Sequence, residues 1–273
     1  ALMETAKTFN EKYPKIKVNV QEFGGAGQAF ERYGIVLASG EGIPDIMTIE
    51  SDYVQSFAEK YPKYFLDLKS LAPSDIDEIV DPSKVTTSYD SEGKLVAIAW
   101  DSGPVVMYYR EDLFRQAGIN PDSIATWEDF IRIGKEFQEK KPNVKFIGWQ
   151  FVQDDGFWRD LMVQNNVYYL NRDGDITISS PKAVESITIL RRLIDEGLAL
   201  NTVNWDGTIR ANKNGEVATY IIGAWWGGTM KDQMPEMKGK WRAMKMPAFN
   251  LNGARASSHG GSTLAITSLD PIK

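Results

Sequence analysis

A strand pattern that ends in two tryptophans among glycines constrains this chain more than any other stretch. Residues 216–230 read EVATYIIGAWWGGTM. The first half is an apolar, β-branched run, which is typical of a buried strand. The second half sets Trp225 and Trp226 between Gly223 and the pair Gly227 and Gly228, where glycine lets other groups approach the backbone closely. The stretch therefore predicts an aromatic platform at a strand end, with burial of both rings as the alternative.

An exposed platform of this kind favours one class of ligand. A flat molecule rich in hydroxyl groups can stack its C–H face on an indole ring, while its edge takes hydrogen bonds from nearby polar groups. We therefore expect Trp225 and Trp226 to contact such a ligand if the rings are exposed.

Composition excludes several classes of protein. The net charge is -6 and no basic stripe is present, which argues against binding to nucleic acid. The chain has no cysteine and one histidine, His259, so thiol catalysis, disulfides and multi-histidine metal centres are excluded, and we expect no metal and no cofactor. No apolar run reaches the roughly eighteen residues of a membrane span, and no signal peptide opens the chain. A length of 273 residues suggests two lobes, although one large α/β domain remains open.

The first hundred residues alternate between helix and strand patterns. After the second helix, GIPDIMTIESD predicts a buried strand that ends at Glu50 and Asp52. In open parallel sheets ligands bind at that end of the strands, although Asp52 equally suits the N-cap of the next helix. A glycine turn at 24–27 lacks the Lys-Ser/Thr ending of a phosphate loop. The expected elements are helices over 1–13, 28–39 and 53–60, and strands over 15–23 and 45–49, with an irregular segment over 63–90.

Residues 93–110, GKLVAIAWDSGPVVMYYR, consist of two strand-like runs interrupted at Asp101 to Pro104. Glycine and proline in the middle of extended chain are typical of a crossover between two sheets. We place the first hinge here. The expected lobes are residues 1–103 with 250–273, and residues 104–249.

The second lobe carries another group of acids and aromatic rings. QFVQDDGFWR contains Asp154, Asp155, Phe157 and Trp158. Adjacent carboxylates cannot face each other across a scissile bond, so this pair does not predict a glycosidase. The expected helices cover 111–117, 126 onward, 160–169 and 181–196, the last with Ala183, Val184, Ile187, Leu190 and Ile194 inward. Strands are expected over 144–149, 241–246 and 264–267, a turn and a strand over 171–180, and a polar loop with a tryptophan over 204–207.

The order of these motifs resembles the extracellular solute-binding proteins of ABC importers, within them the family 1 type that binds sugars and oligosaccharides and includes the maltose-binding proteins. The resemblance rests on GIPDIMTIESD, GKLVAIAWDSGPVVMYYREDLFRQAGI, TWEDF, NGEVATYIIGAWW and HGGSTLAITS, in this order over nearly the whole chain. It implies an α/β, two-lobed periplasmic-binding-protein fold, type II-like, in which each lobe is a sheet flanked by helices and crossing segments form a hinge. The family's first strand and its last helices have no counterpart here.

The resemblance also implies a site and partners. The stacking tryptophan corresponds to Trp225. Trp226 lies beside it and is either a second ligand contact or, if the strand continues, the packing residue. The acidic rim corresponds to Asp52, Glu50 and approximately Asp101. The acid-and-aromatic loop of the second lobe corresponds to Asp154, Asp155, Phe157 and Trp158, and the return strand at the cleft wall carries His259, Gly260 and Gly261. The implied function is capture of a sugar in an interlobe cleft, without catalysis, by a monomer that works with ABC permease subunits outside the cytoplasm, in a periplasm or as a lipid-anchored surface protein whose anchor is absent from this chain.

Three alternatives remain open. A carbohydrate-active hydrolase also lines its cleft with acids and tryptophans, but it needs a facing carboxylate pair. The same fold can bind a phosphate ester or a polyamine instead of a sugar. The aromatic surface can also be an interface for a protein partner.

Overall fold

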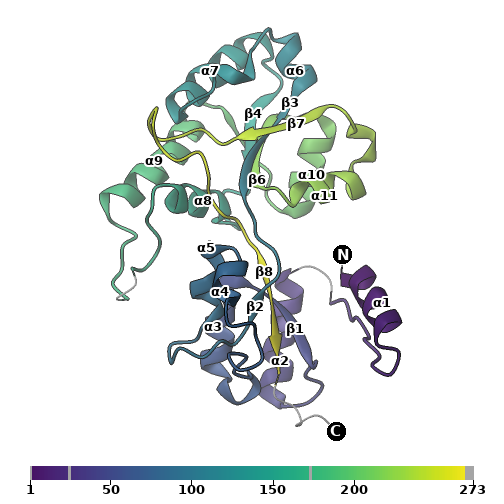
Figure 1. The fold of residues 1–273 in the computed structure, drawn as a ribbon. Helices are drawn as coiled ribbons and strands as arrows, with labels where there is room; N and C mark the ends of the chain where they lie inside the picture. The colour runs from purple at the N-terminus through teal and green to yellow at the C-terminus, as the bar shows by residue number, and fades with distance from the viewer. Residues whose placement is uncertain (1, 24–25, 172–173, 268–273) are drawn as a thin grey trace. The chain divides into compact units, whose positions relative to one another are not determined.

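The chain folds into two compact units, each with its own sheet. The computed structural model describes residues 2–23, 26–171 and 174–267. Unit 1 comprises Ala1–Asp101 and Ser262–Lys273, and unit 2 comprises Ser102–Gly261 (Figure 1). Each unit is a group of residues that mainly contact one another. The functional lobes stay a prediction, with residues 1–103 and 250–273 in one and residues 104–249 in the other.

Unit 1 has a three-stranded sheet in the order β1-β8-β2. Both β1 and β2 are antiparallel to β8, which comes from the far end of the chain and lies in the middle. The apolar face packs on α2 and α3 through a cluster that includes Leu37, Met47 and Val54. The elements are α1 Leu2–Lys12, α2 Ala26–Ser39, β1 Ile46–Glu50, α3 Ser51–Lys60, α4 Ile76–Ile79, α5 Pro82–Val85, β2 Ile98–Ala99 and β8 Ser262–Ile266, with 3-10 turns at Pro62–Tyr64 and Thr86–Ser88.

Two expectations for unit 1 are wrong. Residues 15–23 alternate like a strand but form none, and the side chains of Ile16 and Val20 are exposed. A strand needs a neighbour for its backbone hydrogen bonds, and alternation alone does not supply one. The prediction that Glu50 lies at the end of a parallel strand is also wrong, because the strand paired with β1 in the described part of the chain is antiparallel. Gly24 and Gly25 of the predicted glycine turn lie outside the described residues.

Unit 2 has a five-stranded mixed sheet in the order β5-β4-β6-β3-β7. Strand β4 is parallel to β5 and β6, whereas β3 is antiparallel to β6 and β7. The elements are β3 Val105–Arg110, α6 Glu111–Gln116, α7 Trp127–Lys140, β4 Lys145–Trp149, α8 Gly156–Gln164, α9 Pro181–Asp195, β5 Ala199–Asn201, α10 Trp205–Asn214, β6 Val217–Gly223, α11 Trp226–Gln233 and β7 Trp241–Lys245, with 3-10 turns at Pro121–Ser123 and Pro235–Met237.

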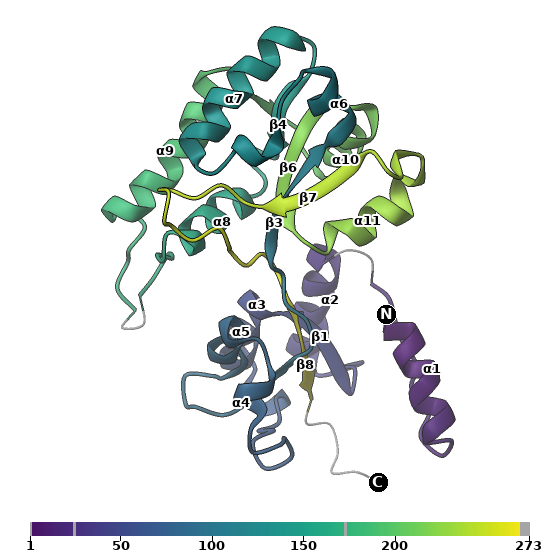
Figure 2. The same cartoon turned by 45° about the horizontal axis from the view of Figure 1, so that its top comes forward.

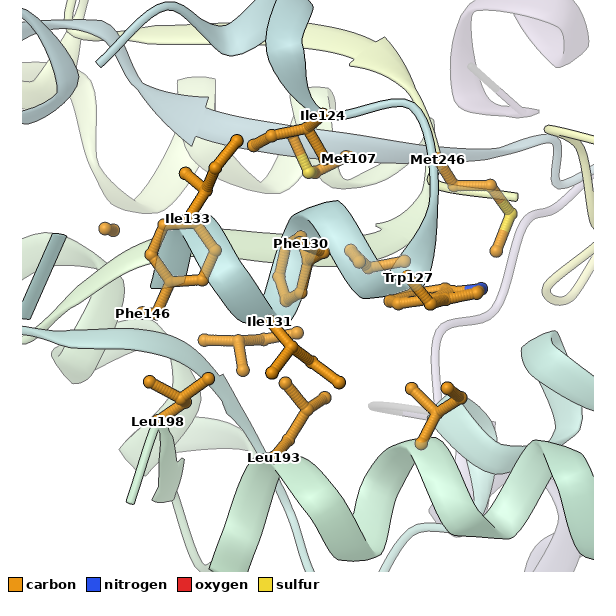
Figure 3. Packing of buried hydrophobic residues seen from close by; sticks show 14 of the residues in the cluster. Met107, Ile124, Trp127, Phe130, Ile131, Ile133, Phe146, Leu193, Leu198 and Met246 are labelled. Carbon is orange, nitrogen blue, oxygen red and sulfur yellow. The ribbon is translucent and has the colours of Figure 1, made fainter. Parts of the chain in front are cut away.

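Helices cover both faces of this sheet. Figures 1 and 2 show α7 and α9 on one side of the strands and α10 and α11 on the other. The side chains of β3 alternate between these two faces. Val105 and Met107 belong to the larger core, whereas Tyr108 belongs to the core under α10 and α11. The larger core contains Phe130, Phe146 and Leu193 among others (Figure 3). Every residue of β6 is buried, as its unbroken apolar run predicts.

Local signals explain several of these elements. Thr126 accepts a hydrogen bond from the Asp129 backbone, and the Asp129 side chain accepts one from the Thr126 backbone, so the predicted capping box starts α7. The predicted buried face of α7, which includes Phe130, Ile133 and Phe137, is confirmed. Gly197 follows α9 with φ of 69°, as the predicted helix end requires. The predicted strands near β1, β4, β7 and β8 are also confirmed to within two residues.

Four expectations for unit 2 are wrong. Helix α8 begins at Gly156 and ends at Gln164, instead of covering 160–169. Residues 171–180 give no strand in their described part, only a bridge between Leu170 and Ile176. The polar segment at 204–207 opens α10 and is not a loop. Helix α9 buries Ser186, Ile189 and Leu193 and exposes three of the residues expected inward, Val184, Ile187 and Ile194.

Candidate functional site

The two adjacent tryptophans at the end of β6 have opposite environments. Trp225 occupies the N-cap position of α11 and keeps 39% of its surface exposed. Trp226 starts the helix and has 0% exposure. The helical turn rotates consecutive side chains apart, so one ring faces solvent and the other enters the core under α10 and α11. Burial contradicts the prediction of Trp226 as a ligand contact and confirms the alternative that it is a packing residue, whereas Trp225 stays a predicted ligand contact.

Glycine at the strand end lets the Trp225 ring lie against the backbone. A Cβ atom on Gly223 would lie 2.2 Å from the Trp225 Nε1 atom. The indole N–H of Trp225 donates a hydrogen bond to the His259 carbonyl oxygen at 3.0 Å. Since this bond uses only the edge of the ring, it fixes the orientation of Trp225 and leaves the π face for stacking.

Trp205 lies beside Trp225, although sequence reasoning did not select it. It is the first residue of α10, whose N-cap Asn204 accepts a hydrogen bond from the Gly207 backbone at 2.8 Å. The ring centroids of Trp205 and Trp225 are 6.1 Å apart with an interplanar angle of 33°. Trp205 is 38% exposed, so the two rings form one aromatic surface from the first turns of two helices.

His259 is held from three directions. Its Nδ1 atom lies 2.9 Å from the Oδ1 atom of Asp160, which is fully buried on α8. Its backbone N–H donates to the Gly103 carbonyl oxygen at 2.7 Å. A Cβ on Gly103 would lie 1.9 Å from the His259 carbonyl oxygen, so only glycine permits this approach. His259, Gly260 and Gly261 lie in irregular chain before β8 and not on the predicted return strand.

Burial and mutual pairing shift the pKa values of Asp160 and His259. Burial raises the pKa of Asp160 from 3.8 to about 6, although the charge and hydrogen bond of His259 oppose the shift. Burial lowers the pKa of His259, but the charge and hydrogen bond of Asp160 together outweigh it, so the His259 pKa lies above its ordinary 6.5. Arg159 and Asp154 act on both groups through their charges.

We expect the contribution of this pair to stability to fall as the pH rises. Between about pH 4 and 6 the folded Asp160 keeps a proton that the unfolded chain has lost, and above pH 6.5 the same holds for His259. In the double variant Asp160→Asn, His259→Gln neither of these two side chains titrates between pH 4 and 8. All other titratable groups are the same in both proteins. Urea unfolding from pH 4 to 8 should therefore show the stability of the wild type, relative to the variant, decreasing with pH. A relative increase would contradict the assignment.

The acid-and-aromatic segment of unit 2 is largely occupied by internal contacts. Phe157 is buried in the core, with its ring 5.1 Å from that of Trp149, which contradicts its prediction as a ligand contact. Trp158 is half-buried and packs on the same core. Asp154 accepts a hydrogen bond from the Gly156 backbone at 2.8 Å, and Asp155 accepts one from the Tyr169 hydroxyl group. Phe157 and Trp158 lie on α8 and not in a loop, because the helix begins earlier than predicted.

The predicted acidic rim belongs to unit 1. Glu50 is paired with Ser262 in the sheet, and the Ser262 backbone N–H donates to the Asp101 side chain, so these acids lie at the same end of β8. Asp52 is exposed in the first turn of α3, where Glu50 and not Asp52 holds the N-cap position. Trp100 precedes Asp101 and is exposed, and sequence reasoning missed it.

The structure thus brings together two groups of predicted residues, one within each unit. Trp225 contacts His259 in unit 2, and in unit 1 Glu50 and Asp101 both lie beside Ser262 at one end of β8. In the sequence, Trp205 stands in a polar segment, whereas Trp100 ends an apolar run directly before Asp101. The Asp160 partner of His259, 99 residues away in the chain, carries no sequence signal.

The residues that the structure describes contain neither a membrane-spanning helix nor a metal-binding cluster. None of the helices described is both long and apolar enough to cross a bilayer. No cluster of three or more His, Cys, Asp or Glu side chains that could bind a metal ion occurs in the described ranges.

Curated relatives include two proteins named for sugar binding. The chain is 28% identical over 273 residues to the arabinooligosaccharide-binding protein of Bacillus subtilis, matching 97% of this chain and 61% of that protein. It is 30% identical over 274 residues to the lactose-binding protein of Rhizobium radiobacter, matching 96% of this chain and 62% of that protein. The chain therefore spans about three fifths of the length of these curated relatives.

A solved structure confirms the predicted fold class. The binding protein associated with the ABC transporter of B. animalis subsp. lactis, in complex with beta-1,6-galactobiose, matches with a TM-score of 0.81 and 25% identity, over 99% of this chain and 66% of that chain. The family model described as "Bacterial extracellular solute-binding protein" matches residues 1–268. The chain therefore belongs to the family of bacterial extracellular solute-binding proteins.

Proposed function

We propose that this chain is the sugar-binding component of an ABC transporter, and that Trp225 is the ring on which the sugar stacks. The observation that carries the proposal is the exposed indole of Trp225, whose N–H bond to His259 fixes the ring and leaves a face open beside Trp205. The names of the relatives supply the class of ligand, since arabinooligosaccharides and lactose are both rich in hydroxyl groups.

The energetics suit reversible capture. An aromatic contact contributes about 0.5–1.5 kcal/mol beyond its buried area, and a hydrogen bond to a charged group about 1.5–3 kcal/mol. Three of each contribute at most about 13.5 kcal/mol, and less a cost of at least about 4 kcal/mol for immobilising the ligand this reaches the about -8 kcal/mol of a micromolar Kd. The rim acids Asp52 and Asp101 are the proposed hydroxyl acceptors of unit 1.

The permease subunits of an importer are the expected protein partners, and the protein acts as a monomer outside the cytoplasm. The segments that join the two units at 101–102 and 261–262 are the proposed hinge. Binding without catalysis is expected, because the site needs only stacking and hydrogen bonds.

Calorimetry with a panel of ligands tests the function. We expect binding of at least one of arabinooligosaccharides, lactose, beta-1,6-galactobiose and maltose, at micromolar Kd, and none of a polyamine or a phosphate ester such as glycerol 3-phosphate. Bound sugar should be recovered intact, without release of new reducing ends. Failure of every neutral sugar, or binding of only the phosphate ester or polyamine, would refute the proposal, and hydrolysis of the sugar would favour the enzyme alternative.

A further inference from the structure

We propose that Asp160 is a positioning residue of the sugar site: it holds the His259 ring, and His259 in turn fixes the carbonyl group that orients Trp225. This inference rests on the proposed function and adds to it a residue that is completely buried on α8 and acts on the ligand only through its neighbours. All three residues belong to unit 2.

Two contacts connect the buried carboxyl group of Asp160 to the exposed ring of Trp225. The Nδ1 atom of His259 lies 2.9 and 3.0 Å from the two carboxyl oxygens of Asp160. The carbonyl oxygen of His259 accepts the indole N–H of Trp225 at 3.0 Å, and the centroids of these two side-chain rings are 5.8 Å apart. A movement of His259 therefore changes both the acceptor of the indole N–H and the ring beside Trp225.

Helix α8 holds the segment that carries His259 at two points, and both belong to Asp160. The Asp160 side chain contacts the imidazole, and its main-chain carbonyl accepts a hydrogen bond from the Ser257 hydroxyl group at 2.7 Å. The segment is also bonded to the chain that leads into β3. The Val105 N–H donates to the Ser257 carbonyl at 3.0 Å, and the His259 N–H donates to the Gly103 carbonyl at 2.7 Å.

The direction of the His259 carbonyl depends on these contacts. The carbonyl belongs to the peptide group that joins His259 to Gly260, and Gly260 and Gly261 have φ of 76° and 102°. Glycine restricts backbone rotation less than other residues do, so local backbone preference does not fix the carbonyl and contacts must. The bond from the ring to Asp160 gives His259 a second fixed point besides its own N–H.

Helix α8 also makes room for the His259 ring. A Cβ atom on Gly156 would lie 2.5 Å from the Cε1 atom of His259, so a larger residue there would displace the ring. Gly156 and Asp160 are four residues apart and therefore lie on the same face of the helix. One residue admits the imidazole and the other binds it, and only 11% of the His259 side chain stays exposed.

A buried carboxyl group is a costly way to hold a ring. Burial opposes the ionised form and raises the pKa of Asp160 to about 6, although the charge of His259 lowers it. An amide in the same place could accept the same hydrogen bond without a buried charge. Because charged partners make the stronger bond, a carboxylate fixes the imidazole more firmly than an amide would.

Three other titratable groups act on the pair. Arg159 lowers the pKa of both Asp160 and His259 through its charge, and Asp154 raises both. Burial, and then the charges of Asp154 and Asp160, raise the pKa of Tyr220 of β6, so this phenol stays neutral. The ionisation of the pair is therefore set mainly by burial and by the attraction between its two members.

The indole N–H of Trp225 measures the positioning directly and without any sugar. Its signal in a nitrogen–proton correlation spectrum of the isotope-labelled protein is identified by its loss in Trp225→Phe. We expect Asp160→Ala to shift this signal and to speed its exchange with solvent about five- to tenfold, because the acceptor carbonyl is no longer fixed. Asp195→Ala, which removes an exposed acid at the end of α9, should leave the signal unchanged.

A double-mutant cycle with sugar separates positioning from a general effect on folding. The probe is whichever of lactose, maltose, beta-1,6-galactobiose and arabinooligosaccharides the wild type binds most tightly in calorimetry. We expect Asp160→Ala to weaken its binding about three- to tenfold in the wild-type background and less than about twofold in the Trp225→Ala background, because Asp160 acts through that ring. Asp160→Asn keeps an acceptor for the imidazole and should recover most of the affinity.

The pH profile of the affinity gives a readout that does not need Asp160→Ala to fold. We expect the affinity of the wild type to be highest between the pKa of Asp160, about 6, and the higher pKa of His259, because only there are both partners charged. On either side one partner is neutral and the bond between them is weaker. The double variant Asp160→Asn, His259→Gln should lack this maximum.

Three results would overturn the inference while leaving the proposed function intact. They are equal weakening by Asp160→Ala in both backgrounds, an unchanged Trp225 indole signal, and a pH profile shared by the wild type and the double variant. Absence of binding of every sugar by the wild type would instead overturn the proposed function, and with it the role of Asp160 in binding. The indole signal, recorded without sugar, would still decide whether Asp160 orients Trp225.

Discussion

Replacement of Trp226 by alanine is expected to lower the free energy of unfolding by about 3–5 kcal/mol, whereas the same change at Trp225 should lower it by less than about 1 kcal/mol. Trp226 is fully buried against Tyr220 and Trp205, so its removal leaves a large cavity under the aromatic surface. Trp225 is exposed and contributes one hydrogen bond, to the His259 carbonyl. Both residues are tryptophans and they are adjacent in the sequence. The difference in stability between the two variants therefore reports only their different positions in the fold.

Urea unfolding of the single variants measures this difference. Trp226→Phe is the matched control, because it keeps most of the packing and removes an indole N–H that is buried without a hydrogen-bond partner in the described part of the chain. We expect this control to lose much less stability than Trp226→Ala. Equal stability of the two alanine variants would show that Trp226 is not the packing residue.

Replacement of Trp225 by alanine is expected to weaken sugar binding by about 1–3 kcal/mol, which is about 5- to 150-fold in Kd. The loss combines the stacking contact with the apolar area that the ring covers on the ligand. Because the ring is exposed in the free protein, the melting temperature should stay nearly unchanged, which separates a binding role from a structural one.

Calorimetry on Trp225→Ala and Trp225→Phe provides the measurement. Phenylalanine retains a ring for stacking but cannot donate to the His259 carbonyl, so partial recovery would assign part of the effect to the hydrogen bond that orients the indole. A large fall in the melting temperature with unchanged affinity would place Trp225 in the core instead and would remove the main support for the proposed platform.

The sequence predicts best those elements whose signals are local. Strand β6 has an unbroken apolar run and α7 has a capping box, and both signals are local and complete within a few residues. The predicted strand over 15–23 fails because alternation describes the two faces of a strand but says nothing about the partner that must bond its backbone. The middle position of β8 in unit 1 depends on pairing over more than two hundred residues, which no local pattern contains.

The residues of the candidate site are likewise predictable only where their signals are local. Trp225 was predicted because glycines flank it and the family resemblance assigns it a stacking role. Its neighbour Trp226 carries the same sequence signal, and only the turn into α11 determines which of the two rings is exposed. The pairing of Asp160 with His259 is not predictable, because the two residues are joined only by the packing of α8 against the 257–259 segment.

The middle position of β8 in its sheet affects the order in which the two units can fold during synthesis. A ribosome releases all of unit 2, residues 102–261, before it releases the strand that lies between β1 and β2. The sheet of unit 1 therefore cannot form until unit 2 has been synthesised, because β1 and β2 both pair with β8. Unit 2 can form its own sheet during this interval, so we expect it to fold before unit 1, opposite to the usual order in which the N-terminal domain folds first.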